Sequence, residues 1–119
     1  HGEGIQHIAL GSDNIYESVE ALQNNGVKLL DVPENYFDFI QQRIPGHKED
    51  LERLRQNKIL IDGNLENGEG LLLQIFTETV IGPIFFEIIQ RKGNQGFGEG
   101  NFQALFDSIE RDQKRRGVL

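Results

Sequence analysis

A glutamate inside an apolar segment is the residue of this chain whose chemistry most needs an explanation. Glu87 lies within the run Ile84–Ile89, whose other members are all large and apolar, as is typical of a buried β-strand. An ionised carboxylate is costly to bury without compensation. We therefore expect a metal ion, an arginine or lysine, or a set of hydrogen-bond donors to hold Glu87.

The alternation of side chains along a β-strand predicts which residues share a face with Glu87. One face of the predicted sheet carries His7, Gln74 and Glu87 among Phe76 and Phe85, and Arg91 follows on the same face. A few polar groups on an apolar and aromatic wall are typical of a ligand pocket. We expect the opposite face to pack under helices through Ile8, Leu10, Leu71, Leu73, Ile75, Phe86 and Ile88.

A histidine and a glutamate on neighbouring strands can bind a divalent metal. Two histidines and one carboxylate, with open positions opposite them, form the metal site of non-haem Fe(II) oxygenases. Gln74 is neutral and can orient a substrate oxygen. The residue types leave other interpretations open, because His7 can be an ordinary hydrogen-bonded residue, and Glu87 can pair with Arg91 or stand at a sheet edge.

Composition restricts the classes of function. The chain has 119 residues, enough for a single domain over 1–119, and a net charge of −7, which argues against nucleic-acid and anionic-membrane partners. It has no cysteine, which excludes disulfides and thiolate metal sites and agrees with a cytoplasmic location. It contains no methionine and begins with His1, so we expect a piece of a longer protein.

The pattern of apolar residues, turns and caps predicts an α+β fold with a mostly antiparallel sheet, helices on one face and a C-terminal helix. We expect strands at Ile5–Leu10, Val27–Leu30, Ile59–Asp62, Leu71–Thr77 and Ile84–Arg91. We expect helices from Ser12 or Asp13 to about Asn25, over Tyr36–Ile44 and over Phe102–Arg116, with a charged helix or turn at Lys48–Gln56. Asn67-Gly68 predicts a hairpin, and Gly93–Gly100 a loop.

Four segments of the chain together resemble 4-hydroxyphenylpyruvate dioxygenases. They are Gly4–Leu10 (GIQHIAL), Leu72–Thr77 (LLQIFT), Phe86–Arg91 (FEIIQR) and Gln95–Phe102 (QGFGEGNF). Each segment is a weak signal by itself, but all four occur in the family's order and at similar spacing. The resemblance extends from about Gly2 to the last residue, and it corresponds to the last part of the family's C-terminal catalytic domain.

The resemblance implies a vicinal-oxygen-chelate fold, in which this chain is one βαβββ module of a longer two-domain dioxygenase. It implies Fe(II) bound by two histidines and one glutamate, with His7 and Glu87 as two ligands and the third, a histidine, upstream of this chain. His1 and His47 lie in no matching motif. It further implies a substrate pocket lined by Gln74, Phe76, Phe85, Phe97 and Phe102, and a terminal helix that covers the site.

The implied activity of the full-length enzyme converts 4-hydroxyphenylpyruvate and O₂ to homogentisate and CO₂ in tyrosine and phenylalanine catabolism. Two alternatives share the fold: 4-hydroxymandelate synthase, which has the same substrate and metal, and a non-catalytic binding module. Because one ligand is missing here, we expect the isolated chain to be inactive and to bind Fe(II) weakly or not at all. A lone module exposes a strand edge and apolar sheet surface, so we also expect a homo-oligomer.

Overall fold

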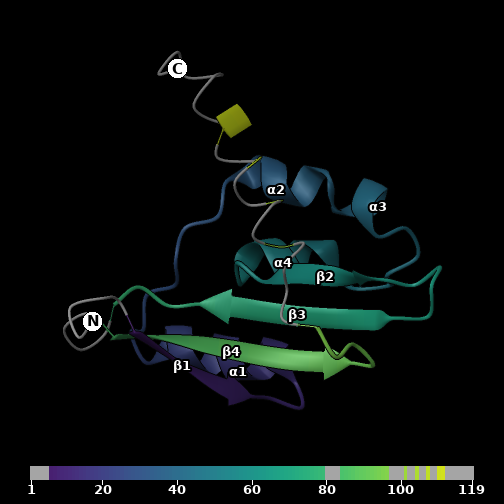
Figure 1. Cartoon of the computed structure of the whole chain (residues 1–119). Coiled ribbons are helices and arrows are strands. Elements are labelled where there is room, and N and C mark those ends of the chain that lie inside the picture. Colours follow the sequence, from purple (N-terminus) through teal and green to yellow (C-terminus); the bar gives the residue numbers. More distant parts are fainter. Residues whose placement is uncertain are drawn as a thin grey trace.

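The computed structural model describes residues 6–79 and 84–96, together with positions 101, 104, 107, 110 and 111 of a C-terminal helix; of residues 6 and 7 it describes the backbone. Figure 1 shows a twisted sheet with helices beside it. The elements in chain order are β1 (Gln6–Gly11), α1 (Ile15–Asn24), α2 (Glu34–Asp38), α3 (Ile40–Arg43), α4 (Leu51–Gln56), β2 (Leu60–Asn64), β3 (Gly70–Phe76) and β4 (Ile84–Lys92).

The four strands form one mixed sheet in the order β1-β4-β3-β2. The pairs β2–β3 and β3–β4 are antiparallel, and β1 runs parallel to β4. A mostly antiparallel sheet in an α+β fold is therefore confirmed. The parallel pair places β1, the first strand in the chain, at the edge of the sheet beside β4, the last of the named strands.

Helix α1 is fixed to the sheet through its N-terminus. Its N-cap is Asn14, whose side-chain oxygen accepts a hydrogen bond from the Glu17 N–H, so the prediction of Ser12 or Asp13 as the cap was wrong. The Gln90 side chain on β4 accepts from the Ile15 N–H at 2.8 Å and donates to the Asp13 carbonyl at 2.7 Å. The first of these bonds satisfies one of the N–H groups that a helix start leaves without partners, and the second holds the backbone just before the N-cap.

The helix predicted after Pro33 is present, but it is divided into two short helices. Phe39 (φ −101°, ψ 0°) separates α2 from α3 within the predicted range Tyr36–Ile44. The predicted strand at Val27–Leu30 was wrong, since that segment makes a single isolated bridge, Leu29 to Thr77. The hairpin at Asn67-Gly68 is confirmed: Gly68 adopts φ +71° in the connection between β2 and β3.

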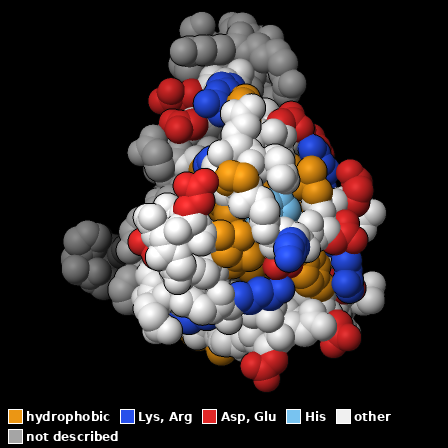
Figure 2. Space-filling view, turned by 90° about the vertical axis from the view of Figure 1, so that its right-hand side faces the viewer, with side chains coloured by type: hydrophobic (Ala, Val, Ile, Leu, Met, Phe, Trp, Pro, Cys, Tyr) orange, Lys and Arg blue, Asp and Glu red, His pale blue; other side chains and the backbone are white. Residues whose placement is uncertain are grey.

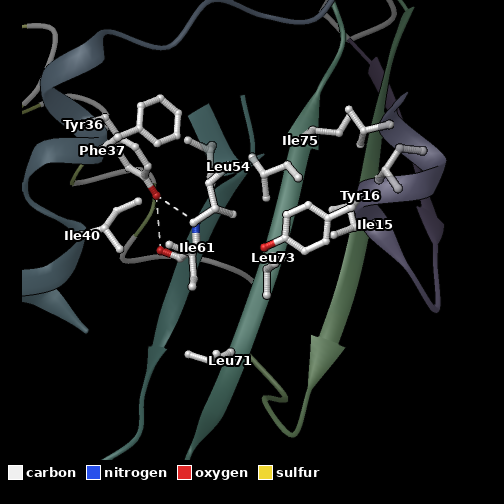
Figure 3. Close-up of a cluster of buried hydrophobic side chains, with 14 of the residues drawn as sticks. Ile15, Tyr16, Tyr36, Phe37, Ile40, Leu54, Ile61, Leu71, Leu73 and Ile75 are labelled. Carbon is white, nitrogen blue, oxygen red and sulfur yellow. Dashed lines mark hydrogen bonds between the residues drawn. The ribbon is translucent and has the colours of Figure 1, made fainter. Parts of the chain in front are cut away.

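The core lies between one face of the sheet and the helices α1 and α4, which Figure 1 shows on the same side. Figure 3 shows several of its members, and its fully buried side chains include Ile15, Val19, Leu54, Ile61, Leu73 and Ile75. Ile8 and Leu10 on β1 were expected to join this core, but they are 46% and 47% exposed. Both residues lie on β1, which is an edge strand of the sheet, and the described helices leave them about half exposed.

On one face of the molecule, acidic and basic side chains are not separated by sign (Figure 2). Figure 2 shows acidic and basic side chains interspersed with small hydrophobic patches on one face of the molecule. A nucleic-acid surface requires clustered positive charge, so this face gives no support to one. Within the described part of the chain, no helix is both long enough and apolar enough to span a bilayer.

The turn of β3 at Gly70 makes a specific prediction about stability. Gly70 has φ +73°, and a Cβ added there would overlap with the Lys92 carbonyl oxygen and lie 2.7 Å from the Gly93 carbonyl carbon. We expect Gly70→Ala to lower the free energy of unfolding by about 1 kcal/mol for the left-handed backbone and by roughly 1–3 kcal/mol more for the overlap. Equilibrium urea unfolding measures both.

Gly68→Ala is the matched control for this prediction. Gly68 has nearly the same φ, +71°, but a Cβ there would meet nothing within 4 Å. The control should show the backbone cost alone. Equal destabilisation by the two substitutions would contradict the close approach of β3 to the end of β4.

Candidate metal centre

The strand register places positions 7 and 87 on the same face of the sheet. Position 7 on β1 pairs with Phe85, and Glu87 on β4 pairs with Ala9, so the two positions are diagonal neighbours on adjacent strands. A strand spacing of about 4.8 Å and a two-residue rise of about 6.6 Å separate such positions by about 8 Å. Two side chains that converge from this separation can reach a common ion.

The same register adds Gln74 and Phe76 to this face. Phe76 on β3 pairs with Glu87, and Gln74 pairs with Ile89. The pairing of the backbone therefore places positions 7, 74 and 87 on a common face, as strand parity predicted.

The carboxylate of Glu87 is buried and hydrogen-bonded. The residue is 8% exposed, and its Oε2 accepts a bond of 2.6 Å from Nε2 of Gln74. Nη1 of Arg91, the alternative partner suggested by the sequence, donates to the carbonyl oxygens of Asn94 and Gly96. An amide donor thus supplies part of the compensation that the position of Glu87 requires.

Gln74 is in turn held by residues that the sequence did not single out. Its Oε1 accepts a 2.7 Å hydrogen bond from Nδ2 of Asn101, and Asn101 Oδ1 accepts a 2.6 Å bond from the hydroxyl of Tyr36. Asn101 lies inside the motif Gln95–Phe102 and just before an amphipathic run, and this position was the only sequence signal that could have pointed to it as a site residue. Tyr36 had no comparable signal, because its partners are distant in sequence.

Two aromatic rings stand beside Glu87 on the same face. Phe76 and Phe85 make an edge-to-face contact with ring centroids 6.1 Å apart, and both residues are partly exposed. Such a pair forms an apolar wall next to the carboxylate. The other two aromatic residues predicted to line the pocket, Phe97 and Phe102, lie outside the described residues.

The histidine whose side chain is described has a structural role. Nδ1 of His47 accepts a 2.8 Å bond from the Glu49 N–H, and Nε2 bonds to Gln41 Oε1 at 3.1 Å. Both ring nitrogens are thereby used away from Glu87. Among the side chains that the structure describes, no group of three His, Asp or Glu residues is placed to hold a metal ion.

Comparison with curated proteins gives matches over the whole chain. It is 66% identical over 119 residues to 4-hydroxyphenylpyruvate dioxygenase from Legionella pneumophila strain Corby, and 64% identical over 119 residues to the enzyme of that name from Pseudomonas aeruginosa. Both matches include 100% of this chain, but 34% and 33% of those proteins. The chain therefore spans about one third of the length of the curated relatives it matches.

This chain is a homologue of one segment of the 4-hydroxyphenylpyruvate dioxygenases. A scan against protein-family models gives no match. Among solved structures, a triple mutant of 4-hydroxymandelate synthase from Streptomyces coelicolor superposes with a TM-score of 0.71 at 36% identity. That match covers 91% of this chain and 30% of the synthase. The vicinal-oxygen-chelate fold expected for a 4-hydroxyphenylpyruvate dioxygenase segment is confirmed.

In this chain, the Tyr36 hydroxyl is the buried end of the hydrogen bonds that lead to Glu87. Burial raises the pKa of Tyr36 to about 12, with the nearby Arg43 opposing part of that effect. The hydroxyl therefore stays protonated well above neutral pH, and it donates a hydrogen bond to Oδ1 of Asn101.

The raised pKa of Tyr36 predicts an alkaline instability with a defined sign. A free tyrosine titrates near pH 10, so above about pH 10 the unfolded chain ionises while the folded chain does not. Stability should be complete below about pH 10 and fall as the pH rises toward 12. The chain has two tyrosines, so Tyr16→Phe leaves Tyr36 alone to be followed by its tyrosinate absorbance. An apparent pKa near 10 before unfolding would contradict the burial of Tyr36.

Proposed function

We propose that the full-length protein carrying this chain is an Fe(II)-dependent 4-hydroxyphenylpyruvate dioxygenase. It would convert 4-hydroxyphenylpyruvate and O₂ to homogentisate and CO₂, a step of tyrosine and phenylalanine catabolism. The identity of 64–66% to proteins of that name over the whole chain supports this activity. A cytoplasmic location and a homo-oligomeric state are parts of the same proposal.

One observation carries the proposal within this chain: the buried carboxylate of Glu87 lies diagonally from position 7 on the same face of the sheet. We assign His7 and Glu87 as two ligands of the metal. A histidine upstream of this chain would supply the third. This donor set fits Fe(II), because imidazole and carboxylate ligands on one side leave the opposite positions open for substrate and O₂.

The residues of this chain would perform the supporting tasks. Gln74 would fix the orientation of the Glu87 carboxylate through its 2.6 Å hydrogen bond, and we propose it also as a substrate-binding residue. Phe76 and Phe85 would exclude water from the ring of the substrate. We also propose the predicted substrate contacts of Phe97 and Phe102. Bound Fe(II) would supply chelation of the 2-oxo acid and activation of O₂.

The substitution Glu87→Ala in the full-length protein tests the assignment of the metal ligand. Loss of a residue that only hydrogen-bonds to a metal ligand weakens metal affinity roughly 10–100-fold. Loss of one of the three protein ligands themselves should weaken Fe(II) affinity by more than this. Turnover of 4-hydroxyphenylpyruvate should fall with it. Anaerobic calorimetric titration and O₂ consumption measure the two quantities.

Glu66→Ala is the control for this substitution. Glu66 is an exposed glutamate in the turn between β2 and β3, so its removal changes the net charge equally without touching the site. Unchanged iron binding and turnover in Glu87→Ala would exclude the ligand role, and would favour a non-catalytic binding module of the same fold.

4-Hydroxymandelate synthase is the second candidate, because a form of that enzyme superposes on this chain with a TM-score of 0.71. The two activities use the same substrate and differ in where oxygen is added. We expect the full-length protein to release homogentisate, since curated relatives of that activity reach 66% identity. Chromatography of the product decides between them: 4-hydroxymandelate as the main product would select the synthase.

A further inference from the structure

Glu87 stands at one end of a continuous series of buried hydrogen bonds that reaches the far edge of the sheet. The series passes from Glu87 to Gln74 (2.6 Å), from Gln74 to Asn101 (2.7 Å) and from Asn101 to Tyr36 (2.6 Å). It therefore joins β4, β3, the C-terminal helix and α2. None of the sequence motifs linked Tyr36 to the metal face.

The series is fixed at its Tyr36 end by the backbone of the edge strand β2. The Tyr36 oxygen accepts from the Ile61 N–H at 2.9 Å and from Nη2 of Arg43 at 3.0 Å. The same Nη2 donates to the Ile61 carbonyl at 3.0 Å. Figure 3 shows the Tyr36 hydroxyl beside the backbone polar groups of Ile61. A hydroxyl that accepts two such bonds has its single hydrogen left for one acceptor. Two acceptors lie within reach, and Asn101 Oδ1 at 2.6 Å is closer than the Ile61 carbonyl oxygen at 3.3 Å.

Each bond in the series has a defined direction. Because Tyr36 donates to Asn101, the side-chain oxygen of Asn101 must point to Tyr36 and its amide nitrogen to Gln74. Gln74 must then turn its oxygen to Asn101 and its amide nitrogen to Glu87. Reversal of either amide would bring like atoms together, so the direction set at Tyr36 determines which atom Gln74 presents to the carboxylate.

Burial makes this dependence strict, because solvent cannot replace a lost partner. Gln74 is 0% exposed, and Asn101 and Tyr36 are 1% exposed. A buried polar atom without a partner costs about 1–3 kcal/mol. A flipped amide would leave unpaired atoms at both of its ends, so the network has one low-energy arrangement.

We propose that Tyr36 is a positioning residue for the Glu87 carboxylate, acting through Asn101 and Gln74. The proposal rests on the proposed function, in which Glu87 is a metal ligand. Its consequence is that a phenol on α2, two residues removed from the carboxylate along the network, sets the geometry and strength of metal binding.

The test is a titration of the full-length protein with Co(II), a spectroscopic substitute for Fe(II). We expect Tyr36→Phe to weaken Co(II) affinity about 10-fold, the lower end of the range for residues behind a ligand. The visible absorption bands of the saturated Co(II) protein should shift as well, because they report ligand geometry. A residue with a merely structural role would not move those bands.

Tyr16→Phe is the matched control. Tyr16 is also buried, and its hydroxyl donates to Glu49 at 2.7 Å, outside the network. The Tyr16→Phe variant loses the same hydroxyl oxygen as Tyr36→Phe. Its Co(II) affinity and its Co(II) absorption spectrum should equal those of the wild type.

Asn101→Asp tests the direction of the bonds. The substitution keeps the acceptor for Tyr36 but replaces the donor to Gln74 with an oxygen. The Gln74 amide then lies between two acceptors, so its own oxygen faces a carboxyl oxygen at one end or the other and its bond to Glu87 is no longer fixed. We expect a larger loss of Co(II) affinity, about 100-fold. If Tyr36→Phe does not fold, Asn101→Asp and Asn101→Ala test the network instead, through Co(II) affinity and the Co(II) absorption bands.

The outcomes distinguish a failure of the positioning role of Tyr36 from a failure of the metal-ligand role of Glu87. Loss of Co(II) binding in Glu87→Ala, with Tyr36→Phe and Asn101→Asp indistinguishable from Tyr16→Phe, would overturn the positioning role alone. Wild-type affinity in Glu87→Ala would overturn the ligand role and the positioning role together. A graded loss in the order Tyr16→Phe, Tyr36→Phe, Asn101→Asp would support both.

Discussion

A buried carboxylate in the middle of a β-sheet is the constraint around which this structure is arranged. Glu87 is placed there by the parallel pairing of β4 with β1 and its antiparallel pairing with β3. Large apolar neighbours provide no compensation for its charge, so polar groups must reach it from other elements. Gln74 does so directly, and the pairing of the strands brings position 7 to the same face. The candidate metal centre is thus inseparable from the register of the sheet.

The two faces of the sheet divide the work of stability and chemistry. The face under α1 and α4 carries the aliphatic core that holds the strands together. The other face carries Gln74, Glu87 and the Phe76–Phe85 pair. Gln90, which points to the core side of β4, ties α1 to the same strand that carries Glu87 on the opposite side. A single strand therefore couples the position of the carboxylate to the packing of the first helix.

Local patterns were sufficient for the parts of the fold that depend on alternation and turn chemistry. The parity of the strands placed Gln74 and Glu87 on one face, and Asn67-Gly68 located the hairpin. The exposure of Ile8 and Leu10 was missed because alternation identifies the side of a strand but not how far the helices extend over it.

The polar partners of Gln74 could not be predicted for a different reason. A hydrogen bond between Tyr36 and Asn101 joins residues 65 positions apart, and no local pattern specifies such a pair. The same limitation applies to Arg43, whose partner Ile61 contributes a backbone carbonyl that is independent of residue type. The resemblance to a known family suggested the proposed ligands, and the three-dimensional packing was needed to find the hydrogen bonds around Glu87.

The position of Tyr36 also affects how this sheet can meet another chain. Strand β2 forms one border of the sheet, and at Ile61 both of its backbone polar groups are occupied by the side chains of Tyr36 and Arg43. An incoming strand would have to displace those bonds, so strand addition is hindered on that side. Strand β1 forms the other border. Two copies joined edge to edge along β1 would each present a blocked β2 border outward, which favours a closed pair over an extended fibre.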